Sequence, residues 1–110
     1  MGALLFDQYS LLHLAVGVVA YFWGIPLTSF ALLHAFFEVV ENTVLGMYII
    51  NHYLTIWPGG KSHPDSIINS AGDHLSALAG WLLAYGLDRW ARSHHLTDDP
   101  ILGLKLVRPD

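Results

Sequence analysis

The amino-acid sequence predicts an all-α, polytopic membrane protein with three transmembrane helices and a short polar C-terminal tail. The chain has 110 residues, enough for one domain, and 54% of them are hydrophobic while only 13% are charged. An average soluble domain carries about 25% charged residues, and a small one has a large surface to cover with polar groups. The hydrophobic residues also form long runs, as between Asp7 and His34, where no charged residue occurs. Composition and run length together favour a membrane.

Three segments are long enough to cross a bilayer core, which requires about 20 residues of helix. We expect helices over about 4–23, 27–50 and 66–90. Gly24 and Pro26 separate the first two, because proline suits the first turn of a new helix. The loop "WPGGKSHP" separates the second from the third, because it is dense in proline and glycine. Asp65 or Ser66 is expected to cap the third helix.

These helices are expected to form a transmembrane domain over 1–92, and the polar tail then covers 93–110. Basic residues set the orientation, since cytoplasmic loops carry an excess of lysine and arginine. Two of them, Arg89 and Arg92, follow the third span, whereas Lys61 stands alone before it. We therefore expect the N-terminus outside and the C-terminus in the cytoplasm, with the protein in the cell inner membrane. A net charge of −4 without any basic run argues against nucleic acid as a partner.

Polar residues interrupt the hydrophobic runs at helical spacing, since residues three or four apart share one face of a helix. The stripes comprise His13 on the first helix, His34, Glu38, Glu41 and Asn42 on the second, and Asp65, Asn69 and Asp73 on the third. At a rise of about 1.5 Å per residue, three antiparallel helices bring His13, Glu38 and Asp73 to a similar depth. The sequence therefore predicts one polar intramembrane site.

Such a site needs compensation for its charge. A carboxylate at the centre of a bilayer costs at least a few kcal/mol unless it is paired or hydrated. The predicted spans contain no lysine or arginine before Arg89, which leaves protons, histidine, water or a bound cation. We expect the other five histidines to be solvated, and His74 is distinguished among them because it adjoins Asp73.

Small residues predict where the helices pack closely, because small-xxx-small faces allow close approach in lipid. One such face lies on the first helix and its end, and the second lies on the third helix. The first face comprises Gly17, Ala20 and Gly24, and the second comprises Ser76, Gly80 and Ala84.

Two motifs, "FFEVVENT" and "DSIINSAGDHLSALAGWLLA", resemble those of a family of small bacterial integral membrane proteins and of the wider VanZ-like group. The family pattern reads approximately Glu-x-x-Glu-Asn-Ser, then Asp-Ser-Ile-x-Asn-Ser-x-x-Asp, then a glycine in the following helix. The matching positions are Glu38, Glu41, Asn42, Asp65, Asn69, Asp73 and Gly80, with His13 as a looser match. The resemblance implies a polytopic membrane fold with a polar intramembrane site, and it implies no particular reaction.

The first hypothesis for the function is a binding or accessory protein. The polar cluster then recognises a ligand, or holds the helices of one subunit in a membrane complex or homo-oligomer. The alternative is a metal-dependent, hydrolase-type enzyme acting on a lipid or lipid-linked substrate. His34 and Glu38 have the i,i+4 spacing that lets two side chains hold one divalent ion, and Glu41 or Asp73 would serve as general base. A further alternative is ligation of haem or a pigment through His13 and His34.

Overall fold

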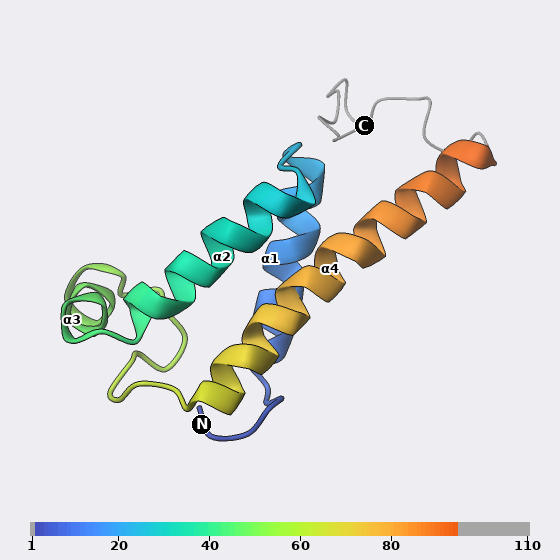
Figure 1. The fold of residues 1–110 in the computed structure, drawn as a ribbon. Helices are drawn as coiled ribbons and strands as arrows, with labels where there is room; N and C mark the ends of the chain where they lie inside the picture. Colours follow the sequence, from blue (N-terminus) through green and yellow to red (C-terminus); the bar gives the residue numbers. More distant parts are fainter. Residues whose placement is uncertain (1, 95–110) are drawn as a thin grey trace.

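The structure is a computed structural model that describes residues 2–94, and every regular element in this range is a helix. The all-α class is therefore confirmed. The helices are α1 (Ser10–Phe22), α2 (Leu27–Glu41), α3 (Val44–Tyr53) and α4 (Ile67–Ser93). In Figure 1, α1 and α4 run in the same general direction, α2 runs back in the opposite direction, and α3 turns away from the other helices.

The first helix begins later than expected, at Ser10 rather than near residue 4. Asp7 and Ser10 bond locally instead: the Asp7 backbone N–H donates to Ser10 Oγ at 3.0 Å, and Asp7 Oδ1 accepts from Tyr9 N at 2.9 Å. Side chains that bond neighbouring backbone groups in this way compete with helix formation. The helix ends before Gly24, whose φ of +81° favours glycine, and α2 starts directly after Pro26.

The prediction of one continuous helix over 27–50 is wrong. The helix ends at Glu41, and α3 follows at an angle of 88° to α2. Two side chains take over the backbone bonds at the break. Asn42 Nδ2 donates to the Glu38 carbonyl at 2.7 Å, and Thr43 Oγ1 donates to the Val40 carbonyl at 2.6 Å. Thr43 Oγ1 also accepts from Gly46 N at 3.0 Å, which makes it the N-cap of α3.

The third expected helix corresponds to α4, which runs over Ile67–Ser93. Ser66 is its N-cap, with Oγ accepting from Asn69 N at 3.1 Å. The helix continues past the predicted end at about 90 and ends at Ser93, which is the first residue of the predicted tail. The rest of the predicted tail, 95–110, lies outside the described residues.

Glycines let α1 and α4 pack backbone to backbone. A Cβ added to Gly17 would lie 1.9 Å from the Ala77 carbonyl oxygen, and one added to Gly80 would lie 1.9 Å from that of Leu14. Ala20, Ser76 and Ala84 are also buried, whereas Gly24 lies in the turn after α1. The close approach of these two helices positions His13 beside α4.

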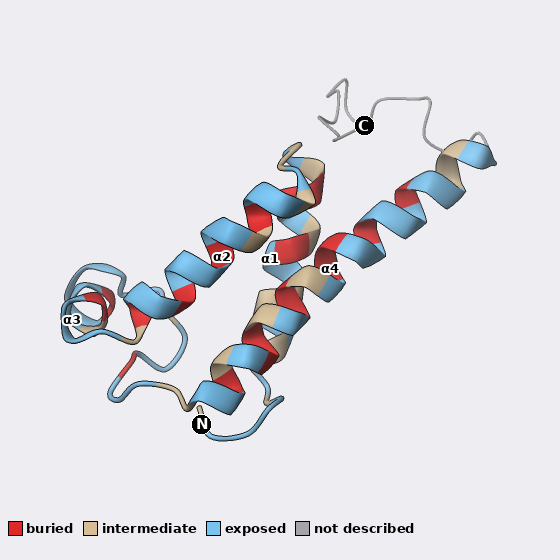
Figure 2. Ribbon diagram, viewed as in Figure 1, coloured by how far each residue is buried: buried red, intermediate tan, exposed pale blue. Residues whose placement is uncertain are grey.

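The apolar core is small and lies at one end of the bundle. It contains Ala20, Tyr21, Phe30, Ala77, Trp81 and Ala84. The Trp81 indole N–H donates to the Ile25 carbonyl at 2.8 Å and so fixes the turn between α1 and α2. Figure 2 shows the buried residues along the facing sides of the helices. At the other end of the bundle these facing sides carry polar residues.

Within residues 2–94, no individual helix is both long and apolar enough to cross a bilayer. Only α2 and α3, taken together across their bend, satisfy the length and composition requirements.

Candidate functional site

A cluster of histidine and carboxylate side chains occupies the interior where α1, α2 and α4 meet. Each helix contributes: His13 comes from α1, His34, Glu38 and Glu41 from α2, and Asp73 from α4. Apart from His13, these residues are at most 6% exposed. Both Glu38 and Glu41 are buried, because their three-residue spacing places them on one face of α2. Five of the predicted site residues therefore meet inside the protein.

Three histidine rings form a chain across the helices. His13 Nδ1 lies 3.0 Å from His34 Nε2, and His34 Nδ1 lies 3.1 Å from His74 Nδ1. A neutral histidine has one donor and one acceptor nitrogen, so both ring–ring contacts are satisfied when the protons point the same way along the chain. His74, which we expected to be solvated, is half-buried and belongs to the site.

The carboxylates of the cluster lie close to His13, but several of their oxygens have no hydrogen-bond partner. His13 Nε2 lies 3.3 Å from Asp73 Oδ2, and His13 Nδ1 lies 3.5 Å from Glu38 Oε1. Both oxygens of Glu38, together with Glu41 Oε1 and Asp73 Oδ1, are buried without a hydrogen-bond partner. A buried polar atom without a partner costs about 1–3 kcal/mol, and more when it is charged. The cluster therefore has spare capacity to bind a donor or a cation.

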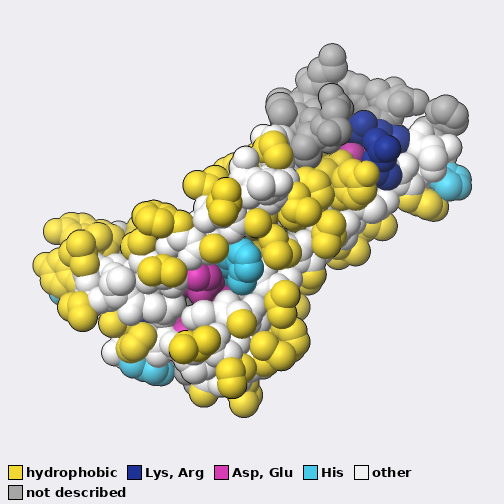
Figure 3. Space-filling model, viewed as in Figure 1, with side chains coloured by type: hydrophobic (Ala, Val, Ile, Leu, Met, Phe, Trp, Pro, Cys, Tyr) yellow, Lys and Arg dark blue, Asp and Glu magenta, His cyan; other side chains and the backbone are white. Residues whose placement is uncertain are grey.

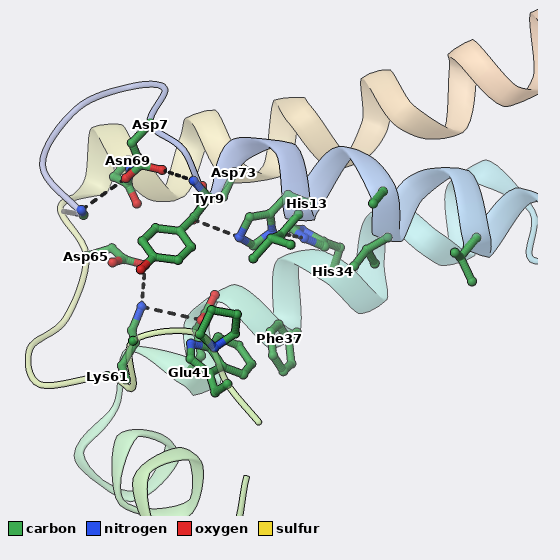
Figure 4. Close-up of a pocket in the computed structure, with 18 of the residues that line it drawn as sticks. Asp7, Tyr9, His13, His34, Phe37, Glu41, Lys61, Asp65, Asn69 and Asp73 are labelled. Atoms are coloured by element: carbon green, nitrogen blue, oxygen red, sulfur yellow. Dashed lines mark hydrogen bonds and ion pairs between the residues drawn. The ribbon is translucent and has the colours of Figure 1, made fainter. Parts of the chain in front are cut away.

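Lys61 compensates the charge at one edge of the cluster. The ammonium lies 2.5 Å from Asp65 Oδ2 and 3.5 Å from Glu41 Oε2 (Figure 4). Its side chain is 8% exposed, and Asn51 holds its backbone through bonds to both the N–H and the carbonyl. Sequence reasoning placed Lys61 in a loop outside the site. Helical spacing could not have found it, because Lys61 and Asp65 lie in the loop before α4 and not on a helix.

Two predicted site residues, Asn42 and Asn69, bind backbone at the margin of the cluster rather than its centre. Asn42 Oδ1 accepts from Asp65 N at 2.8 Å and so ties the end of α2 to the segment before α4. Asn69 Nδ2 donates to the Leu4 carbonyl at 2.6 Å and to Asp7 Oδ2 at 3.2 Å. These amides hold the N-terminal segment and the loop against α4, and we assign them a structural role.

A cavity of about 740 Å³ reaches the cluster. Its apolar walls include Val16 and Val19 of α1 and Leu33 and Phe37 of α2, and Trp57 lines it from the loop. Its polar end includes His13, His34, Glu41, Lys61, Asp65 and Asp73. Figure 4 shows this end, with His13 turned toward His34 and Lys61 directed toward Asp65 and Glu41. The cavity is thus amphipathic along its length.

The three helices, the histidine chain and the cavity together define the site. Comparisons of the chain with protein-family models, with curated proteins and with solved structures find no match.

Proposed function

We propose that the chain is a small integral membrane protein that binds an amphipathic small molecule, with its polar head at the His/Glu/Asp cluster and its apolar part along the cavity. The observation that carries the proposal is the cavity, which has apolar walls from α1 and α2 and a polar end in the protein interior. Such a shape matches a lipid-like ligand with one apolar part and one polar head.

The distribution of side chains supports a lipid environment. Large apolar residues cover the outside of every described helix; examples are Leu11, Leu32, Phe36, Leu45 and Leu82, which are between 51% and 70% exposed. The charged groups Glu38, Glu41 and Asp73 lie inside. Figure 3 shows a patch of acidic and histidine side chains between α2 and α4, surrounded by hydrophobic ones. Water would disfavour this arrangement, since exposed apolar patches in soluble monomers rarely exceed a few hundred Å².

The orientation proposed from the sequence places the N-terminus outside and the C-terminus in the cytoplasm. The Trp57–Lys61 side of the cavity then faces the outer leaflet, and Arg89 and Arg92 lie on the cytoplasmic side. The resemblance of the two motifs to VanZ-like membrane proteins agrees with an inner-membrane location. An accessory role in a larger complex would use the same apolar surface against other helices.

The haem alternative receives less support from the geometry. Axial ligands bind iron from opposite faces of the macrocycle, whereas His13 and His34 are joined directly by a 3.0 Å contact. A macrocycle between these two rings would require α1 and α2 to separate. We therefore do not propose haem or pigment ligation by this pair.

Filling the cavity is expected to displace the ligand. Leu33→Trp places a larger side chain in the cavity wall, where overpacking costs about 1–3 kcal/mol. This corresponds to a loss of affinity of about 5-fold to 150-fold. Native mass spectrometry of protein purified in mild detergent measures the bound lipid-like molecule directly, and a fluorescent single-chain lipid measures affinity.

Leu32→Trp is the matched control, because Leu32 is adjacent on α2 and 69% exposed but does not line the cavity. We expect this variant to retain the ligand. Equal binding by both tryptophan variants, or no bound lipid in the wild-type protein under either assay, would count against an amphiphile in the cavity. Co-purification of other membrane chains without lipid would favour the accessory role.

A further inference from the structure

We infer that His13, Glu38, Glu41 and Asp73 form a binding site for one divalent transition-metal ion. One side-chain atom from each of these residues lies within 4.8 Å of the corresponding atoms of the others. The inference goes beyond the proposed function, because an amphiphile could occupy the cavity whether or not a metal is present.

The unpartnered oxygens are the second and independent observation. Glu38, Glu41 and Asp73 are each at least nine-tenths buried, and all three direct buried oxygens toward the cluster without a hydrogen-bond donor. Lys61 reaches only the other oxygen of Glu41, at 3.5 Å. Three acidic groups in one buried volume repel one another when ionised. A divalent cation would use the free oxygens and offset that repulsion at once.

The histidine chain prepares His13 as a ligand. When His13 donates through Nδ1 to His34, and His34 donates through Nδ1 to His74, the lone pair of His13 Nε2 faces Asp73 Oδ2 at 3.3 Å. His13 Nε2 and Asp73 Oδ2 are then both acceptors without a proton between them, so a cation bound to both atoms would be favoured. A ligating histidine usually donates its other N–H to a fixed partner, which sets the tautomer. His34 would be that partner, and it would therefore orient His13 rather than bind the ion.

The dimensions and the donor set indicate the class of ion. Metal–ligand bonds of about 2.1 Å allow ligand atoms to be at most about 4.2 Å apart. Since the four atoms lie within 4.8 Å of one another, the cluster needs to contract by at most about 0.6 Å. One imidazole and three carboxylates, without any thiolate, suit Mn²⁺, Fe²⁺ or Zn²⁺. Glu41 and Asp73 act as ligands in this assignment, in place of the general-base role expected from the sequence.

The ion would lie at the polar end of the cavity, which His13, Glu41 and Asp73 line. It would there supply a Lewis-acid centre facing the head of a bound amphiphile. The metal-binding inference depends on the four ligands alone, so it can fail while ligand binding in the cavity is retained.

The test is the metal content of detergent-purified full-length protein, measured by inductively coupled plasma mass spectrometry after dialysis against Mn²⁺ or Zn²⁺. Wild type is compared with Asp73→Asn and Glu38→Gln, which keep the shape of each side chain and remove its charge. Asp88→Asn is the matched control, because Asp88 is a buried carboxylate on α4 that bonds Tyr21 and Arg92 outside the cluster. We expect near-stoichiometric metal in wild type and control, and at least about tenfold weaker binding in the two cluster variants.

Thermal unfolding with and without added metal provides a second measurement, since an ion that binds the folded state raises its stability. We expect the unfolding temperature of wild type and Asp88→Asn to rise with Mn²⁺ or Zn²⁺, and that of the cluster variants to remain constant. The wild-type result is decisive even where a variant does not fold. Wild-type protein without metal and without a thermal shift would overturn the inference, as would equal metal content in all four proteins.

Discussion

Gly17→Ala is expected to separate α1 from α4 and to abolish the stable fold. The added Cβ would lie 1.9 Å from the Ala77 carbonyl oxygen and 2.7 Å from Trp81 N. Both atoms belong to the backbone of α4, so neither can move away by changing a rotamer. The helices would have to part, at a cost of about 3 kcal/mol or more. Because His13 is on α1, the polar cluster would lose one wall. Thermal unfolding in detergent, followed by circular dichroism, measures the effect.

Gly80→Ala is expected to act in the same way from the other helix, since its Cβ would lie 1.9 Å from the Leu14 carbonyl oxygen. Gly86→Ala is the matched control on α4, because a Cβ there meets nothing within 4 Å. Alanine is the better helix former, so this variant should be unchanged or more stable by up to about 1 kcal/mol. Wild-type stability in Gly17→Ala would show that the two helices do not pack through these glycines.

Lys61→Met is expected to have the second large effect, a loss of about 3–5 kcal/mol, because it leaves Glu41 and Asp65 without their cation. Lys61 and Glu41 are 8% and 2% exposed, so water replaces little of the lost interaction. The loop before α4 should open more often at the cluster, since the ammonium joins Asp65 to α2, although the bonds from Asn42 and Asn51 would remain. Chemical unfolding in detergent measures the stability, and hydrogen exchange over the Trp57–Asp65 segment measures the local opening.

A double variant separates lost charge from lost packing. Adding Glu41→Gln to Lys61→Met removes one of the unpaired carboxylates, so it should recover part of the lost stability. Double-mutant cycles measure such coupling, which is about 0.5–3 kcal/mol for residues in contact. Strictly additive losses would mean that Lys61 stabilises the loop through its aliphatic stem or its backbone, rather than through Glu41.

Much of the fold follows from the sequence because glycine and proline act locally. The turn at Gly24 and Pro26 and the loop before α4 were predicted from residue type alone. The break after Glu41 was not, because Asn42 and Thr43 lie within a hydrophobic run. Asn42 was interpreted as a site residue, whereas the side chains of both Asn42 and Thr43 bond backbone groups at the end of α2. A hydropathy value averaged over a window of residues hides the effect of a single capping residue, so it does not reveal this helix end.

The site was predicted where helical spacing determined it. His34, Glu38 and Glu41 share one face of α2, and Asp73 faces them from α4. Spacing within one helix does not show what a loop brings to the same place, so Lys61 was missed. It also does not show the rotation of one helix about its axis relative to another, which directs His74 of α4 toward His34 of α2.

We propose that the apolar exterior faces lipid while the polar cluster lies inside. The chain has no cysteine, so single cysteines report accessibility without background. Leu32→Cys and Leu82→Cys test exposed apolar positions, and Ser62→Cys tests the exposed loop. Each variant is treated with a membrane-impermeant maleimide in carbonate-washed membranes. The proposal predicts rapid labelling at Ser62 from outside, and labelling at Leu32 and Leu82 only after denaturation. Equal labelling at all three positions would contradict it, because the apolar surface would then face water.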